Sequence, residues 1–268
     1  MKKLHFEYSM EINYAEMVST CSYTIKCIPQ KNNRQIPDNL AIGICPPSNY
    51  CLGFDGLHNQ QIYGRNDEPH DRFVFKISGD VTVGMALYDE PENDDISMVF
   101  KHPHGLNIPG SRIKEYYNSL GVDDISDTYR KALNVMYRFY EDFEYRPNTT
   151  DIYTTAEEAF AQGYGVCQDF AHIFIALMHL ANIPARYVTG LITGEGASHA
   201  WVEVLCEGKW YGLDPTNNKP VFDEHIKLGV GRDANDCMIN RGIMRGGGLH
   251  TPIIKVSVEE IGKDKDDD

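Results

Sequence analysis

A buried helix that starts at a cysteine is the strongest constraint on what this chain can fold into. After Cys167, apolar residues recur at three- and four-residue steps, as on one face of a helix, and the pattern stops before Pro184: Phe170, Ile173, Phe174, Leu177, Leu180 and Ala181. Gly163 and Gly165 precede the cysteine and force a tight turn into the helix. Cys167 is therefore expected at the helix N-terminus, where free backbone N–H groups and the positive end of the helix dipole favour a thiolate.

The rest of the chain predicts an α+β protein in two parts. Short alternating runs separated by Pro, Gly, Asn and Asp predict an antiparallel β-sandwich over residues 1–100. An acidic stretch followed by His, Pro and Gly over 89–110 predicts a linker. Helices are predicted over 111–120 and about 127–143, a further short one after Thr155, and strands over 185–192, 199–205, 209–213 and 253–258. Residues 110–268 are thus expected to form a second domain.

Composition excludes some partners and favours a compartment. The formal charge of −14 argues against a nucleic-acid partner and an anionic membrane surface, both of which need a basic face. The chain has no signal-peptide pattern and no long apolar run, so a cytoplasmic location is expected. Seven cysteines suit a reducing compartment better than a disulfide framework. The acidic run at 89–95 and the tail at 263–268 are expected to be solvated.

A predicted hairpin brings a histidine and an aspartate together. Glu207-Gly208 is a turn candidate between two strand patterns, and a two-residue loop there places Cys206 opposite Lys209. His199 and Asp214 then lie diagonally on the same sheet face, within reach of each other. A slip of one residue would put them on opposite faces. A thiol becomes a strong nucleophile when a base takes its proton and a third group orients that base. The register therefore makes Cys167, His199 and Asp214 a candidate catalytic triad.

Four stretches of the sequence form a recognisable set: Gly165-Val166-Cys167-Gln168-Asp169-Phe170-Ala171, Ile183-Pro184-Ala185-Arg186-Tyr187-Val188, His199-Ala200-Trp201-Val202-Glu203-Val204 and Leu213-Asp214-Pro215-Thr216-Asn217. Together they resemble the transglutaminase-like superfamily, in particular its bacterial branch of predicted cysteine proteases. The stretch from His225 to Asp233 is also similar. The resemblance covers about 155–235 strongly and the first hundred residues more weakly. It implies a papain-like core, with the cysteine helix packed on an antiparallel sheet. It also implies Cys167 as nucleophile, His199 as base and Asp214 as the orienting carboxylate.

Other residues are candidates for supporting roles. The Cys167 backbone N–H is a natural oxyanion donor, and the Gln162 amide could supply a second one or be a solvent-exposed or capping group. Trp201 and Tyr164 could shield the imidazole, line a substrate pocket or pack in the core. His102 and His104 are expected in a loop. We expect no metal and no cofactor, because no third ligand accompanies that pair and no EF-hand pattern occurs.

These features predict a cysteine-dependent hydrolase, a peptidase or amidase, that cleaves an amide bond in a peptide or small amide through a thioester. Two alternatives stay open. The same residues would serve an acyltransferase or transglutaminase that uses an amine acceptor, and the fold could also be a binding module without catalysis.

Overall fold

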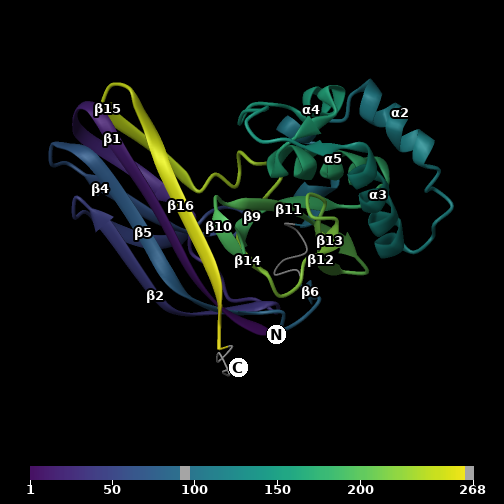
Figure 1. Cartoon of the computed structure of the whole chain (residues 1–268), viewed down its shortest axis with the longest axis horizontal. Helices are drawn as coiled ribbons and strands as arrows, with labels where there is room; N and C mark the ends of the chain where they lie inside the picture. Colours follow the sequence, from purple (N-terminus) through teal and green to yellow (C-terminus); the bar gives the residue numbers. More distant parts are fainter. Residues whose placement is uncertain (91–96, 263–268) are drawn as a thin grey trace, which may run out of the picture.

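The computed structural model of the chain describes residues 1–90 and 97–262. Two lobes lie side by side (Figure 1), one made of strands and the other of a smaller sheet covered by helices. The strand lobe is one eight-stranded antiparallel sheet: β1 (Lys2–Ile25), β2 (Gln35–Cys45), β3 (Asn49–Phe54), β4 (Gln60–Asn66), β5 (His70–Val83), β10 (Gly194–Gly196), β15 (Asn240–Gly246) and β16 (His250–Ile261).

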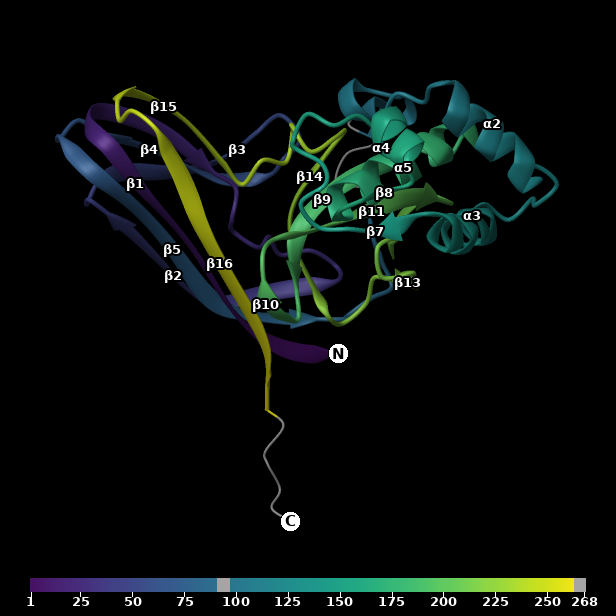
Figure 2. The same cartoon turned by 45° about the horizontal axis from the view of Figure 1, so that its top comes forward.

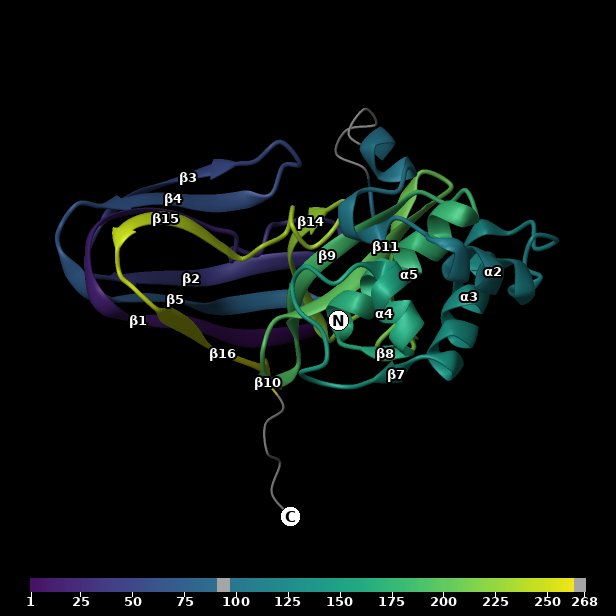
Figure 3. The same ribbon diagram turned by 90° about the horizontal axis from the view of Figure 1, so that it is seen from above.

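Strand β1 holds both halves of this lobe together. Its first half pairs with β5 and β16, and its second half pairs with β4 and β15. The register shifts between Asn13 and Val18, where the strand passes from one set of neighbours to the other. The two halves of the sheet face each other: the ring of Tyr23, in the second half of β1, lies 5.0 Å from the ring of Phe73 in β5. The lobe is therefore built like the predicted sandwich, but with one strand common to both layers (Figure 3).

In the described residues, the second lobe combines a six-stranded antiparallel sheet with helices that lie on one side of it (Figure 2). Its strands are β6 (Tyr88–Asp89), β9 (Ala185–Ile192), β11 (His199–Cys206), β12 (Lys209–Asp214), β13 (Lys219–Pro220) and β14 (His225–Gly231). The helices described for this lobe are α2 (Ser111–Leu120), α3 (Thr128–Asp142), α4 (Ala156–Gln162) and α5 (Cys167–Leu180). Two short 3-10 helices, η1 (Met98–Lys101) and η2 (Gly105–Asn107), precede them. A short parallel strand pair consists of β7 (Glu144–Tyr145) and β8 (Tyr164–Gly165). This is the expected mixed α and β class, with the cysteine helix on an antiparallel sheet.

Helix α5 is more deeply buried than its sequence pattern predicts. Every residue from Asp169 to Met178 is buried, not only one apolar face. The reason is that α2, α3 and α4 contact the helix from one side, while β9 and β11 contact it from the other. Phe170, for example, packs against the rings of Phe139 and Phe143. The face of α5 that would be exposed if the helix packed on the sheet alone is therefore covered by the other helices and lies in the core.

The two lobes do not correspond to two continuous segments of the chain, as the predicted domains 1–100 and 110–268 would. Strands β15 and β16 pair with β1, and β10 pairs with β16, so segments from the second half of the chain complete the first sheet. The physical reason is that the long edges of β1 need hydrogen-bonding partners. In the opposite direction, β6 joins the second sheet through β12.

The predicted linker at 89–110 is only partly described. Residues 91–96, which include most of the acidic run at 89–95, and the tail 263–268 lie outside the described residues. The remaining part contains η1 and η2, with His102 and His104 next to these turns. Among the helices that the structure describes, none is long and apolar enough to cross a membrane.

We predict that Gly190→Ala destabilises the protein by about 1–3 kcal/mol or more, the usual cost of overpacking a core. A Cβ atom at Gly190 of β9 would lie 2.2 Å from the Trp201 ring and 2.3 Å from the Ile226 carbonyl oxygen. Gly43→Ala on β2 is the matched control, because no atom lies within 4 Å of a Cβ there. Urea unfolding of both variants checks this. Equal stability of the two variants would contradict the packing described for Trp201.

Candidate active site

The turn before α5 places Cys167 at the first position of that helix. Val166 is the N-cap residue, and its backbone N–H donates to the buried Asp169 carboxylate at 2.8 Å. Thr150 Oγ1 donates to the same oxygen at 2.6 Å. A Cβ atom at Gly165 would lie 2.6 Å from this oxygen, so only glycine fits there. Burial raises the pKa of Asp169, against these hydrogen bonds. The predicted tight turn at the cysteine is confirmed, and Asp169 is what holds it.

The hairpin of β11 and β12 has the predicted register. Cys206 lies opposite Lys209, and Val202 lies opposite Leu213. Both loop residues, Glu207 and Gly208, have positive φ angles of 50° and 73°, as two-residue hairpin loops of type I′ require. This register puts His199 and Asp214 on one side of the sheet, as expected.

Asp214 is a fully buried carboxylate that accepts five hydrogen bonds. Its Oδ1 accepts from the backbone N–H groups of Thr216 and Asn217, both at 3.1 Å. Its Oδ2 accepts from His199 Nε2 at 2.8 Å, His225 Nε2 at 3.0 Å and Asn217 Nδ2 at 2.7 Å. Burial raises the pKa of Asp214, but the hydrogen bonds from the two histidines hold that pKa well below its ordinary value. Asp214 therefore stays ionised.

His199 lies between Asp214 and Cys167. Its Nε2 faces Asp214, which leaves Nδ1 for the cysteine side chain. Burial lowers the pKa of His199, but hydrogen bonds to Asp214 and Cys167 outweigh that effect and raise this pKa to about 10. At neutral pH the imidazole then carries a proton on each nitrogen. In this state it can pair with a thiolate and donate a proton to a leaving group.

Two further residues belong to the site, and sequence reasoning missed both as partners of Asp214. His225 and Asn217 donate to the same oxygen as His199. Burial lowers the pKa of His225, so this ring is a neutral donor. Both residues stand in stretches that carry the family resemblance, which is the only signal the sequence offers. Residue spacing could not reveal His225, because β14 pairs with β9 and not with β12.

The three supporting candidates lie in different places. Trp201 is buried, with its ring 6.2 Å from that of His199 and 5.2 Å from that of His225, so it packs against both imidazoles. Tyr164 is half-buried, with the Arg146 guanidinium 4.0 Å over its ring. Gln162 ends α4, and its exposed side chain has no hydrogen-bond partner among residues 1–90 and 97–262. Its role as an oxyanion donor stays a prediction.

One group in the described part of the chain has ligand atoms close enough to hold a metal ion. The ligand atoms of His199, Asp214 and His225 lie within 4.8 Å of one another. These atoms already hydrogen-bond to each other, so a cation would have to displace the contacts that orient His199. The geometry fits a hydrogen-bonded catalytic site better than a metal site.

Part of the chain matches the sequence model of a known family. Residues 119–215 match the family model of the transglutaminase-like superfamily, and this range contains Cys167, His199 and Asp214. Residues 119–215 thus form a transglutaminase-like core. The resemblance predicted from the sequence motifs is confirmed.

Relatives of the transglutaminase-like core and of the whole chain are known. An uncharacterized protein of Mycobacterium leprae is 37% identical over 128 residues, which cover 44% of this chain and 46%, less than half, of that protein. An uncharacterized protein of Mycobacterium tuberculosis is 27% identical over 285 aligned positions, which cover 94% of this chain and 90% of that protein. The crystal structure of a predicted cysteine protease from Cytophaga hutchinsonii superposes on this chain with a TM-score of 0.77 and 20% sequence identity. The match covers 98% of this chain and 92% of that one. That structure shares the fold of both lobes.

We predict that iodoacetamide modifies Cys167 at least about tenfold faster than Cys45 and Cys51 at about pH 6.5, where an ordinary thiol is only about 1% ionised. Cys45 and Cys51 are exposed and serve as internal controls, whereas Cys21, Cys27, Cys206 and Cys237 are buried. Burial raises the pKa of each buried thiol, that of Cys206 to about 12. Peptide mapping by mass spectrometry measures the rates. Equal rates at the three accessible thiols would contradict an activated cysteine.

The raised pKa of His199 predicts a pH-dependent stability. The folded-state pKa of about 10 lies above the ordinary value of 6.5, so protonated His199 stabilises the fold fully below about pH 6.5. This contribution is lost as the pH rises through about 10. The difference in unfolding free energy between the wild type and His199→Gln should therefore shrink from pH 6.5 to 10. Urea unfolding across this range measures it, and a constant difference would show that His199 is neutral in the folded protein.

Proposed function

We propose that this protein is a cysteine-dependent hydrolase that cleaves an amide bond through a thioester intermediate, with Cys167, His199 and Asp214 as its triad. The observation that carries the proposal is the 2.8 Å hydrogen bond from His199 Nε2 to the buried Asp214, which leaves Nδ1 for the cysteine at the start of α5. A family model of transglutaminase-like proteins and a structural neighbour described as a cysteine protease support the class.

The reaction starts from an ion pair in which the proton of Cys167 is held by His199, so the sulfur is a thiolate. Asp214 stabilises the imidazolium and keeps Nε2 turned away from the sulfur. The thiolate attacks the carbonyl carbon of the amide and forms a tetrahedral oxyanion. The Cys167 backbone N–H, at the positive end of α5, is placed to stabilise that charge.

The second half of the reaction releases two products. His199 returns its proton to the amide nitrogen, the C–N bond breaks, and the amine leaves while the acyl group stays on sulfur as a thioester. His199 then takes a proton from water as this water attacks the thioester. The carboxylic acid is released, and the proton taken from water stays on His199, which restores the thiolate–imidazolium pair. An amine in place of the water would give a new amide, which is the acyltransferase reaction.

Turnover of a library of peptides and small amides, with and without an added amine, tests the proposal. Mass spectrometry distinguishes a hydrolysed acid from an amide formed with the added amine. We expect the acid to predominate. A predominant amine adduct would make the protein a transglutaminase-like acyltransferase, and failure of Cys167 to form any acyl-enzyme would favour the binding module.

Substitutions in the triad should differ in the size of their effects. Cys167→Ala and His199→Ala should each abolish turnover, and the double variant should be no worse, because the pair acts as a unit. Asp214→Asn should lower kcat/KM by about 10–10³-fold, less than the roughly 10⁴-fold of a serine protease, because a thiolate–imidazolium pair already has separated charges. Cys51→Ala is the matched control and should retain full activity. Unchanged turnover in Asp214→Asn would reduce the site to a dyad.

A further inference from the structure

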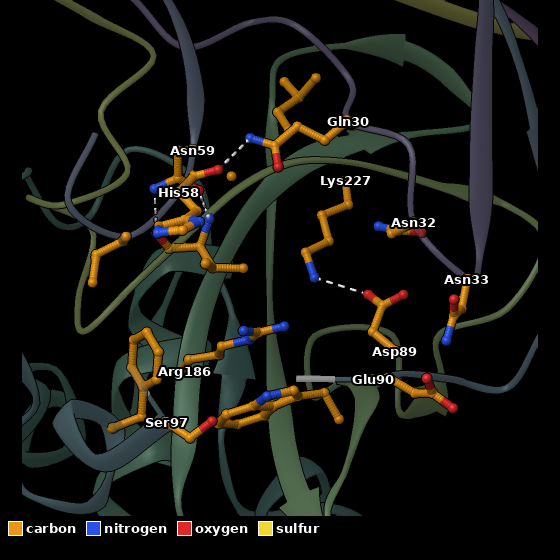
Figure 4. Close-up of a pocket in the computed structure, with 16 residues that line it drawn as sticks. Gln30, Asn32, Asn33, His58, Asn59, Asp89, Glu90, Ser97, Arg186 and Lys227 are labelled. Atoms are coloured by element: carbon orange, nitrogen blue, oxygen red, sulfur yellow. Dashed lines mark hydrogen bonds and ion pairs between the residues drawn. The ribbon is translucent and has the colours of Figure 1, made fainter. Parts of the chain in front are cut away.

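A cavity of about 300 Å³ lies between the two lobes, apart from the candidate triad. The strand lobe lines it with loops around residues 30–33 and 57–59, and the second lobe contributes Arg186, Trp210 and Lys227 (Figure 4). Asp89 and Glu90 line it from the segment that joins the lobes. Cys167, His199 and Asp214 do not line it. We refer to this space as the interlobe cavity.

A buried cluster of charges lies at the interlobe cavity, and three of its members, Asp89, Arg186 and Lys227, line the cavity. Glu203 is fully buried and lies 2.7 Å from Arg186 Nη2, 2.9 Å from Lys227 Nζ and 3.8 Å from Arg34 Nη1. Lys227 also lies 2.9 Å from the carboxylate of Asp89. With Glu90, which also lines the cavity, three cations and three carboxylates balance. Arg186 lies on one side of the cavity and Asp89 with Glu90 on the other (Figure 4), so a ligand with an anionic group at one end and a hydrogen-bond donor at the other would complement both sides.

Two hydrogen-bond donors in the wall of the cavity remain available for that anionic group. Arg186 uses Nε and Nη2 on Glu203, and its Nη1 has no hydrogen-bond partner among the residues described. The guanidinium carbon lies 4.2 Å over the Trp210 ring, so the two side chains are neighbours. Trp210 is 1% exposed, and its Nε1 is buried without a partner in the described chain. A carboxylate beside this stacked pair, within reach of Arg186 Nη1 and of the Nε1 edge of the Trp210 ring, would satisfy both donors.

The side of the cavity formed by Asp89 requires a donor instead of an acceptor. One oxygen of Asp89 pairs with Lys227, and its Oδ1 is buried without a partner within residues 1–90 and 97–262. Glu90 lies next to it at the exposed rim (Figure 4). A chain of three salt bridges of 2.7–2.9 Å connects the two sides of the cavity: Arg186 to Glu203, Glu203 to Lys227, and Lys227 to Asp89. A ligand for both sides therefore has a carboxylate and a nearby N–H donor.

We propose that the interlobe cavity binds an α-amino carboxylate, as a free amino acid or as the C-terminal residue of a peptide. The carboxylate contacts Arg186 and Trp210, and the nitrogen donates to Asp89 Oδ1. Leu57, Phe100 and Val230 give the cavity an apolar wall for the side chain of the ligand. This proposal does not depend on the proposed hydrolase activity, because it uses none of the triad residues.

Calorimetric titration of the full-length protein with three leucine derivatives tests the ligand class. Leucine carries an ammonium group, N-acetyl-leucine has the amide N–H of a peptide terminus, and N-acetyl-leucinamide lacks the carboxylate. We expect saturable binding of leucine or N-acetyl-leucine, with at least about tenfold weaker binding of the amide. The stronger of the two acids distinguishes a free amino acid from a peptide terminus. Equal binding of acid and amide, binding of inorganic phosphate alone, or no saturation by about 10 mM would overturn the proposal.

Binding measurements on substituted proteins test whether the ligand binds in this cavity. Trp210→Phe keeps the ring and removes one donor, so binding should weaken about three- to tenfold, and Arg186→Gln should weaken it more. Trp201→Phe is the matched control, because Trp201 Nε1 is also buried without a partner in the described chain but does not line this cavity. Circular dichroism checks folding. If Arg186→Gln does not fold, Trp210→Phe decides, and wild-type affinity in that variant would place the ligand elsewhere. Cys167→Ala should bind like the wild type, which separates this proposal from the catalytic one.

Discussion

The hydrogen bonds to the buried carboxylate of Asp214 are the interaction on which the organisation of the second lobe depends. A charge without solvent must be compensated inside the protein, and here five donors from three segments do so. They come from β11, from the turn that follows β12 and from the start of β14. The same contacts fix the orientation of His199 and keep Asp214 ionised, so the requirement for a stable fold and the requirement for an oriented base are met by one carboxylate.

Alternation along β11 connects this site with the interlobe cavity. His199, Trp201 and Glu203 occupy every second position, so they share one face of the strand. His199 binds Asp214, Trp201 packs against two imidazoles, and Glu203 holds Arg186 and Lys227. Ala200, Val202 and Val204, on the other face, join the core around α5. One short strand thus supplies the candidate base, its aromatic neighbour and the buried anion of a second candidate site.

The two lobes are tied by chain crossings as well as by packing. Strands β15 and β16 follow the second lobe in the sequence and pair with β1, and β6, which follows the strand lobe, pairs with β12 in the second sheet. Asn59 of the strand lobe also accepts from the Val230 N–H and donates to its carbonyl oxygen. The structural neighbour from Cytophaga hutchinsonii covers 98% of this chain, so both lobes occur together in that fold as well.

Local features of the sequence determined the parts of the site that lie close along the chain. Gly163 and Gly165 placed Cys167 at a helix start, and Glu207-Gly208 set the hairpin that aligns His199 with Asp214, because turns and two-residue loops depend on neighbouring residues alone. Contacts between segments that lie far apart in the sequence were decided by the tertiary structure. His225 reaches Asp214 from β14, β16 returns to β1, and Glu203 gathers three cations from distant segments. No periodicity encodes these contacts, since they depend on the order of strands in the sheets and on how the two lobes pack.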